Sequence, residues 1–284
     1  MEIRKVGVLG CGLMGSGIAQ ICATAGYDTI VREVNDAFLQ KGIDGIRKFS
    51  GKMFEKGQSK VKSDEVMSHL RGTTQLEDMA DRDLIIEAVP EILDLKKETF
   101  QTLGKICRDD VILCSNTSSL SIVEMAMFSK HPDRFFGLHF FNPVPIMELV
   151  EVVRTILNPE ETFRQLFSFA ESLGKKPIAA TDKPGFIVNR LLVPFLLDAI
   201  RAYEQGFGSI EDIDKGMQLG CRHPMGPFTL LDFVGLDTTY YIANIMFDEF
   251  KDPRFAPPTL LKRMVLAGQY GRKSGKGFYD YAKK

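Results

Sequence analysis

The chain has 284 residues, of which 44% are hydrophobic and 26% are charged, enough apolar side chain to build the cores of two modest domains. Its 36 lysine and arginine residues nearly cancel its 37 aspartate and glutamate residues. The overall charge therefore gives no reason to expect nucleic acid or an acidic membrane surface as a partner, and any anionic ligand must be held by local features.

The cysteine pattern and the lengths of the apolar runs predict the cellular environment of the protein. The cysteines stand singly, without a C-x-x-C pair or metal-ligand spacing, at Cys11, Cys22, Cys107, Cys114 and Cys221. This usage predicts a reducing, cytoplasmic environment. No apolar run is long enough to span a bilayer, and Met1 to Gly10 already resemble the opening strand of a domain, which leaves no room for a signal or transit peptide.

The first elements in chain order predict a βαβ unit. Lys5 to Gly10 is a short apolar strand that ends in glycine, and the small and apolar residues from Met14 to Ala25 suit a buried helix. A second strand is expected over Asp28 to Val34. A mixed apolar and charged helical pattern then runs from Asp36 to about Lys56.

The middle of the chain continues the alternation of helices and strands. Ser63 resembles a helix start, because a serine side chain can accept a bond from a first-turn amide, and this helix is expected to end at Arg71-Gly72. Compact apolar runs predict strands over residues 83–89, 111–115, 135–139 and 149–153, with helices over residues 91–106 and 160–173. This order favours a largely parallel sheet that is covered on both faces.

A change of pattern follows the Asp182-Lys183-Pro184-Gly185 segment. Strand-like runs give way to helical patterns over residues 186–205, 209–219, 227–250 and 259–267, and the tail GRKSGKGFYDY is a basic, glycine-rich turn that ends in aromatic residues. We therefore expect an α/β domain over residues 1–184 and an all-α domain over residues 185–284.

A G-x-G-x-x-G motif lies between the first strand and the first helix, formed by Gly10, Cys11, Gly12, Leu13, Met14 and Gly15. Its glycines permit a tight turn, close approach of the backbone to a pyrophosphate, and close packing of helix on strand. The free amides and the dipole at the helix amino terminus favour an anion there. The motif in this context predicts a Rossmann-type domain that binds a dinucleotide.

Glu33, at the end of the second strand, bears on the choice of dinucleotide. Its carboxylate can bond the adenosine ribose hydroxyls and would repel a 2′-phosphate, which favours NAD over NADP. The neighbouring Arg32 leaves NADP possible, because an arginine that turns inward could accommodate the phosphate; otherwise it is a surface residue.

His139 and Glu151 have the residue types of a general base and its partner. His139 ends an apolar strand, so it is expected at the carboxyl edge of the sheet, where it is either the base for a hydroxyl proton or a core histidine bonded to a carbonyl. Glu151 lies in the apolar run ELVEVV, where a carboxylate is costly unless paired. It either orients an imidazole or faces water on an edge strand.

Other polar residues have a structural and a functional interpretation. The segment from Asn116 to Ser119 follows a strand and either caps the next helix or donates to a substrate oxygen, as Asn189 in PGFIVNRLL also could. Lys52 and Lys56 lie four residues apart on one helix face, where they are either solvated or meet the phosphates of a large anionic carrier.

Five segments together resemble the 3-hydroxyacyl-CoA dehydrogenase family: GCGLMG, NTSSL, HFFNPVPIMELVEVV, PGFIVNR and GKGFYDY. The resemblance runs nearly from end to end, and HFFNP followed by ELVEVV is far more specific than the glycine motif. The chain looks most similar to the short bacterial members that act on 3-hydroxybutyryl-CoA.

The resemblance implies roles for single residues. His139 would be the base, Glu151 its partner, and Ser118 and Asn189 the contacts to the reacting oxygen. Further cofactor contacts are implied at Glu91, Lys96, Ser118, Asn142 and Lys273, and CoA-binding lysines at Lys52 and Lys56. The chain departs from many relatives at Glu33, where they have aspartate, and at Gln58, where a further basic residue is expected.

The expected reaction is reversible oxidation of an (S)-3-hydroxyacyl-CoA to the 3-ketoacyl-CoA, with NAD and without a metal, in fatty acid or butanoate metabolism. The resemblance also implies a homodimer formed mostly by the helical domain, and an active site between the domains, since His139 and Asn189 lie on either side of the boundary. Two alternatives stay open: a dehydrogenase of a free hydroxy acid such as a sugar acid, and a non-catalytic NAD-binding protein.

Overall fold

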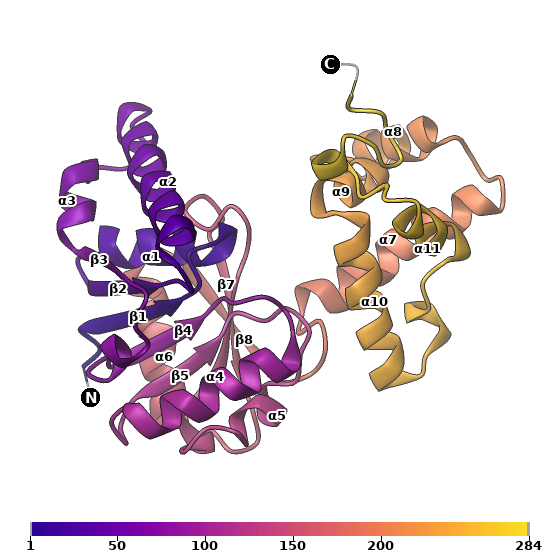
Figure 1. Ribbon diagram of the computed structural model, residues 1–284. Coiled ribbons are helices and arrows are strands. Elements are labelled where there is room, and N and C mark those ends of the chain that lie inside the picture. The colour runs from indigo at the N-terminus through magenta and orange to yellow at the C-terminus, as the bar shows by residue number, and fades with distance from the viewer. Residues whose placement is uncertain (1, 283–284) are drawn as a thin grey trace. The chain divides into compact units, whose positions relative to one another are not determined.

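The structure, a computed structural model, describes residues 2–282 and divides into two units, Met1–Asp182 and Lys183–Lys284 (Figure 1). Strands and helices alternate through the first unit, and the elements of the second unit are helices. The predicted class, an α/β Rossmann-type domain followed by an all-α domain, is confirmed.

A sheet of eight strands forms the first unit, in the order β3-β2-β1-β4-β5-β6-β7-β8. The strands are β1 (Lys5–Leu9), β2 (Asp28–Arg32), β3 (Leu70–Thr73), β4 (Leu84–Glu87), β5 (Ile112–Ser115), β6 (Phe135–Phe140), β7 (Leu149–Arg154) and β8 (Lys176–Thr181). Neighbouring strands are parallel except β6 and β7, which are antiparallel. The strand order reverses between β1 and β4, and ligands of such sheets bind at the carboxyl ends of the strands at that point.

Helices cover both faces of this sheet (Figure 1). Residues of α1 (Leu13–Thr24), α2 (Asp36–Glu55), α3 (Ser63–Ser68) and α6 (Glu160–Ser172) share one buried cluster with strand residues. On the other face, Phe100 of α4 (Leu93–Ile106) meets Phe135 of β6 at a centroid distance of 4.5 Å, and α4 contacts α5 (Ile122–Ala126). Burial on two sides explains why the inner strands are largely continuous apolar runs, whereas the edge strands β3 and β8 are not.

The pleat of the sheet gathers polar side chains on one face at its carboxyl edge. Side chains alternate between the faces of a sheet, and Ile86 of β4 and Leu138 of β6 belong to the cluster beneath α1. The next residues, Glu87 and His139, therefore point to the face that α4 and α5 cover. Glu151 of β7 pairs with His139 and points the same way.

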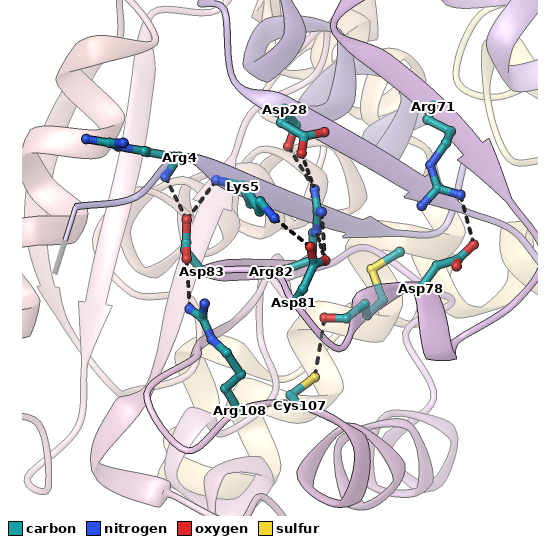
Figure 2. Close-up of polar contacts among 11 residues, drawn as sticks. Arg4, Lys5, Asp28, Arg71, Asp78, Asp81, Arg82, Asp83, Cys107 and Arg108 are labelled. Carbon is teal, nitrogen blue, oxygen red and sulfur yellow. Dashed lines mark hydrogen bonds and ion pairs between the residues drawn. The ribbon is translucent and has the colours of Figure 1, made fainter.

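A network of charged residues fixes the opposite, amino edge of the sheet (Figure 2). Asp83, just before β4, accepts hydrogen bonds from the backbone amides of Arg4 and Lys5, both at 2.8 Å, and from the Arg108 side chain at 2.8 Å. These bonds join the start of β1 to the start of β4. They thereby help to hold the amino ends of these two strands together.

The prediction for residues 63–72 was partly wrong. Helix α3 ends at Ser68, and Arg71 and Gly72 belong to the edge strand β3, which pairs with β2. Ser63 is the first helical residue and its hydroxyl bonds Ser50 and the Arg47 carbonyl instead of capping the helix. The helix expected after Ser119 is α5, for which no bounds were predicted. Strand β8 and the short 3-10 turns at Glu77–Met79 and Pro132–Arg134 were missed.

The second unit consists of α7 (Val188–Glu204), α8 (Ile210–Cys221), α9 (Pro227–Val234), α10 (Leu236–Phe250) and α11 (Thr259–Leu266), with 3-10 turns at Pro253–Phe255 and Arg272–Ser274. They share one apolar core. The single helix expected over residues 227–250 was wrong, because Gly235, at φ 103°, separates α9 from α10. No helix within residues 2–282 combines the length and apolar character needed to cross a membrane.

The GKGFYDY segment is fixed by two buried aspartates of this second unit. Asp232 accepts hydrogen bonds from the amides of Phe278 and Tyr279, both at 2.9 Å, and Asp214 accepts one from the Tyr279 hydroxyl at 2.9 Å. A Cβ atom on Gly277 would lie 2.0 Å from an Asp232 carboxylate oxygen. The motif thus has a structural reason for its glycine and its tyrosine.

Candidate active site

The glycine motif forms a close turn between β1 and α1. Gly10 has a φ of 91°, and a Cβ atom there would lie 2.7 Å from the Ala88 carbonyl oxygen; one on Gly15 would lie 1.9 Å from the Gly10 carbonyl oxygen. Among residues 2–282, no side chain caps the start of α1. Gly12 and Leu13 are exposed, so the first backbone amides of α1 are accessible where the strand order reverses between β1 and β4. Free amides at this place are what a pyrophosphate requires.

Glu33 lies against this turn. One carboxylate oxygen accepts a hydrogen bond from the Cys11 amide at 2.8 Å, and the other accepts one from the Val34 amide at 2.7 Å. The Arg32 side chain donates to the Thr74 carbonyl at 3.3 Å. The carboxylate is thus the charged group beside the glycines, where the adenosine ribose of a dinucleotide would lie, and the residues present fit NAD.

His139 and Glu151 form a buried pair across β6 and β7. The antiparallel register places them opposite each other, and His139 Nδ1 lies 2.6 Å from a Glu151 carboxylate oxygen. Glu151 is fully buried and His139 is 6% exposed. A carboxylate that bonds one imidazole nitrogen fixes the tautomer and orients the ring, and it stabilises an imidazolium. The geometry is that of a base and its orienting partner.

The loop after β5 is hydrogen-bonded to strand β6 and to the loop after β4. The Asn116 side-chain oxygen accepts a hydrogen bond from the Phe140 amide at 2.9 Å, next to His139. Glu91 accepts from the Ser118 amide at 3.2 Å and from the Thr117 hydroxyl. The Ser118 segment is therefore anchored on one side to the strand that carries His139 and on the other to the loop after β4.

Lys96 is more deeply buried than a typical ligand-contacting lysine. Its ammonium lies 2.6 Å from a Glu87 carboxylate oxygen and 3.0 Å from one of Glu91, and its side chain is 1% exposed. Desolvation opposes its charge, but the two carboxylates raise the pKa of Lys96 above its ordinary value. Burial raises the pKa of Glu87 despite the bonds it accepts.

Glu87 was missed by the sequence analysis, although a signal was present. It stands within the apolar run DLIIEAV, as Glu151 stands within ELVEVV, and a carboxylate inside such a run is costly without a partner. The same reasoning that singled out Glu151 applies to it. Its partner Lys96 lies nine residues further along the chain, on α4.

The remaining predicted residues lie elsewhere. Lys52, in the last turn of α2, and Lys56, its C-cap, are exposed, as is Asn142 between β6 and β7. In the second unit, Asn189 is a half-buried residue near the start of α7, and the Lys273 ammonium lies 2.6 Å from an Asp237 oxygen. The first unit thus brings His139, Glu151 and the Ser118 segment together at the carboxyl edge of its sheet.

The similarity to known proteins extends over nearly the whole chain. Residues 5–183 match the model of the 3-hydroxyacyl-CoA dehydrogenase NAD binding domain, and residues 185–281 match that of the 3-hydroxyacyl-CoA dehydrogenase C-terminal domain. A 3-hydroxybutyryl-CoA dehydrogenase of Mycobacterium tuberculosis is 48% identical over 98% of this chain and 99% of its own. One from Clostridioides difficile is 44% identical over 98% and 100%. The crystal structure of (S)-3-hydroxybutyryl-CoA dehydrogenase PaaH1 from Ralstonia eutropha matches with a TM-score of 0.95, at 40% identity over 99% of each chain.

Proposed function

The chain belongs to the 3-hydroxyacyl-CoA dehydrogenase family, and on that premise we propose that it oxidises an (S)-3-hydroxyacyl-CoA reversibly to the 3-ketoacyl-CoA with NAD. The preferred substrate is 3-hydroxybutyryl-CoA and its product acetoacetyl-CoA, as the names of the relatives with matching length suggest. The observation that carries the proposal is the buried His139–Glu151 pair at the carboxyl edge of the dinucleotide-binding sheet.

His139 is the general base of the proposed reaction. The alcohol loses its hydroxyl proton to the imidazole as its C3 hydrogen leaves as hydride, and in the reverse direction the imidazolium returns the proton to the oxygen. Bound NAD supplies the hydride acceptor. Glu151 holds the ring by its Nδ1 side, so that Nε2 is the atom that exchanges the proton, and it stabilises the imidazolium.

Two further groups are assigned to the reacting oxygen. The Ser118 hydroxyl, on the segment anchored by Glu91, and the Asn189 amide, from the second unit, donate hydrogen bonds that stabilise the partial negative charge on the oxygen in the transition state. Glu33 and the first amides of α1 hold the dinucleotide, with Asn142 and Lys273 as further cofactor contacts.

The decisive experiment is the oxidation of NADH, followed by its absorbance, with acetoacetyl-CoA as substrate. Free acetoacetate and NADPH are tested in parallel. We expect rapid turnover that requires both the CoA ester and NADH, because Glu33 disfavours a 2′-phosphate. Turnover of the free acid at a comparable rate would favour a hydroxy-acid dehydrogenase, and NADH binding without any turnover would favour a non-catalytic protein.

The exposed lysines at the end of α2 provide a test of the CoA carrier. Replacement of Lys52 and Lys56 together by alanine is expected to raise KM for acetoacetyl-CoA about tenfold at low salt, because each lysine pairs with a phosphate. The effect should shrink as salt is added, while kcat changes little. The control is Lys41→Ala with Lys105→Ala, which removes two exposed lysines from helices of the same unit. Equal KM values in both double variants would contradict the assignment.

A homodimer formed by the second unit is part of the proposal. Large apolar side chains on its helices and turns are strongly exposed, among them Leu191 (72%), Phe207 (79%), Leu219 (73%) and Leu266 (78%). Apolar side chains that form one continuous patch are typical of surfaces that another chain covers, and we propose that these side chains contribute to such a surface. Sedimentation velocity tests it, and a monomer at micromolar concentration would refute it.

The free cysteines of the chain support the cytoplasmic location, which remains a prediction.

A further inference from the structure

We infer that Glu87 is a positioning residue of this dehydrogenase: through Lys96 it fixes Glu91, and with Glu91 the Ser118 segment, in the arrangement that binds cofactor and substrate. The inference rests on the proposed function and deepens it. It assigns a role to a residue that has no place among the predicted site residues, and it changes the role expected of Lys96.

Glu87 is held from three sides at the end of β4. Its register partner Ser115, the last residue of β5, donates its hydroxyl to one carboxylate oxygen at 2.6 Å. The other oxygen accepts the Lys96 ammonium at 2.6 Å and the Val89 amide at 2.7 Å. The carboxylate is fully buried, so its position is determined by the sheet and not by solvent.

Lys96 transmits this position to Glu91. The ammonium lies between the carboxylates of Glu87 and Glu91, with 1% of the side chain exposed. To reach a cofactor directly it would have to leave the buried Glu87 carboxylate without its cationic partner, which is strongly unfavourable. Lys96 therefore acts on the bound cofactor through Glu91, whose side chain is 28% exposed.

Glu91 connects the network to the reaction. It accepts hydrogen bonds from the Ser118 amide and the Thr117 hydroxyl, so the loops after β4 and β5 are joined through its carboxylate. The same edge borders the glycine turn, because Leu9 of β1 pairs with Glu87 and the Ala88 amide bonds the Leu9 carbonyl at 2.8 Å. A displaced Lys96 would move groups on both the cofactor side and the substrate side.

A purely stabilising role explains this arrangement less well. Burying the charges of Glu87 and Lys96 costs desolvation, and a buried ion pair is weak evidence for stability because apolar residues of the same volume often serve as well. A network that joins two strand ends to two site loops is expected instead where a fixed geometry is needed.

The test is the affinity for NADH of the Glu87→Gln variant, measured by calorimetry on the full-length protein. The amide keeps the shape of the side chain: its oxygen can still accept from the Val89 amide, and its NH2 group would donate to the Ser115 hydroxyl, which now donates to Glu87. It loses the charge that holds Lys96. We expect the Kd for NADH to rise about tenfold, since the ion pair between Lys96 and Glu87 is replaced by a weaker bond to a neutral amide, with KM for NADH following it. Lys96→Met should have a similar effect. The double variant should bind no worse than Lys96→Met alone, because Glu87 acts through Lys96.

The matched control is Asp83→Asn, at the other end of β4. Asp83 is also a largely buried carboxylate with two amide donors and one cationic partner. Its amide variant should leave the Kd for NADH unchanged. If Glu87→Gln does not fold, Ser115→Ala is the substitute. It removes one bond to the same carboxylate and the acceptor of the Thr117 amide, and it should raise the Kd two- to threefold, roughly, by loosening both.

Three outcomes would separate the hypotheses. An unchanged Kd in folded Glu87→Gln, or in Ser115→Ala where that variant replaces it, overturns the positioning role while the proposed reaction stands. Wild-type protein that binds NADH without reducing acetoacetyl-CoA refutes the proposed reaction, and the Kd comparison still decides the role of Glu87. Additive losses in the double variant overturn the transmission through Lys96.

Discussion

Each end of β4 carries a carboxylate with a basic partner, but the two pairs differ in how far water reaches them. Asp83 stands at the amino end and Glu87 at the carboxyl end, and each accepts a backbone amide and a basic side chain. At the amino end the partner Arg108 is 43% exposed, whereas at the carboxyl end Lys96 is 1% exposed. Water thus shares in the solvation of one pair and is excluded from the other.

The neighbouring pairs repeat this contrast. Arg82, 4% exposed, meets Asp28 and Asp81, whose side chains are more than half exposed (Figure 2). His139 meets Glu151, and both are buried. Partly solvated pairs incur little desolvation and can contribute to stability, whereas fully buried pairs incur much of it and are retained where they perform a function. We therefore expect the amino edge to serve the fold and the carboxyl edge to serve the proposed reaction.

The largest effect that this comparison predicts is on the rate of the His139→Gln variant. Loss of the base should lower kcat by on the order of 10² to 10⁴, because glutamine cannot take up the hydroxyl proton. The Kd for NADH and the thermal midpoint should change little. Stopped-flow reduction of acetoacetyl-CoA measures the chemical step, and His69→Gln, an exposed histidine after α3, is the control. Near-normal turnover of His139→Gln would contradict a role of the carboxyl edge in the reaction.

The next effect falls on stability, at the amino edge. Arg82→Gln should lower the free energy of unfolding by about 1–3 kcal/mol, because a nearly buried guanidinium loses its bonds to Asp28 and Asp81. Urea denaturation measures it, and kcat should stay unchanged. Arg47→Gln, which removes an exposed pair with Asp64, should cost less than about 0.5 kcal/mol. A loss of activity in Arg82→Gln without a loss of stability would break the comparison.

The sequence predicts most of this fold because apolar runs and glycines act locally. It fails at β3, a short strand in which polar and half-exposed residues give no apolar run, and whose strand state depends on pairing with the distant β2. It also fails at Gly235, because one glycine inside a long helical pattern is compatible with either a continuous helix or a break.

The candidate site shows the same limit. His139 and Glu151 can be singled out because each is a polar residue in an apolar strand run, and their antiparallel register brings them into contact. Their pairing itself is long-range and cannot be calculated from spacing. Lys96 illustrates the opposite case: its place on α4 suggests an exposed lysine, and only the side chains of Glu87 and Glu91 make its burial possible.

The smallest effect concerns pH, and it has opposite signs at the two ends of β4. Burial opposes the charge of Asp83, but bonds from Arg4, Lys5 and Arg108 hold the pKa of Asp83 below its usual value. The contribution of Asp83 to stability is therefore present above the unfolded-state pKa of about 4, and it is lost as pH falls through the folded-state value. Burial raises the pKa of Glu87, so its contribution is present below the unfolded-state pKa and is lost as pH rises through the folded-state value.

Urea midpoints measured from neutral pH down to about pH 3 should therefore show a shallower acid limb in Asp83→Asn than in the wild type, since that variant no longer has this carboxylate to protonate. The Glu87→Gln curve should keep the acid limb and differ from the wild type mainly toward neutral pH. If both variants flattened the acid limb equally, the two ends of the strand would not differ in the way that their solvation requires.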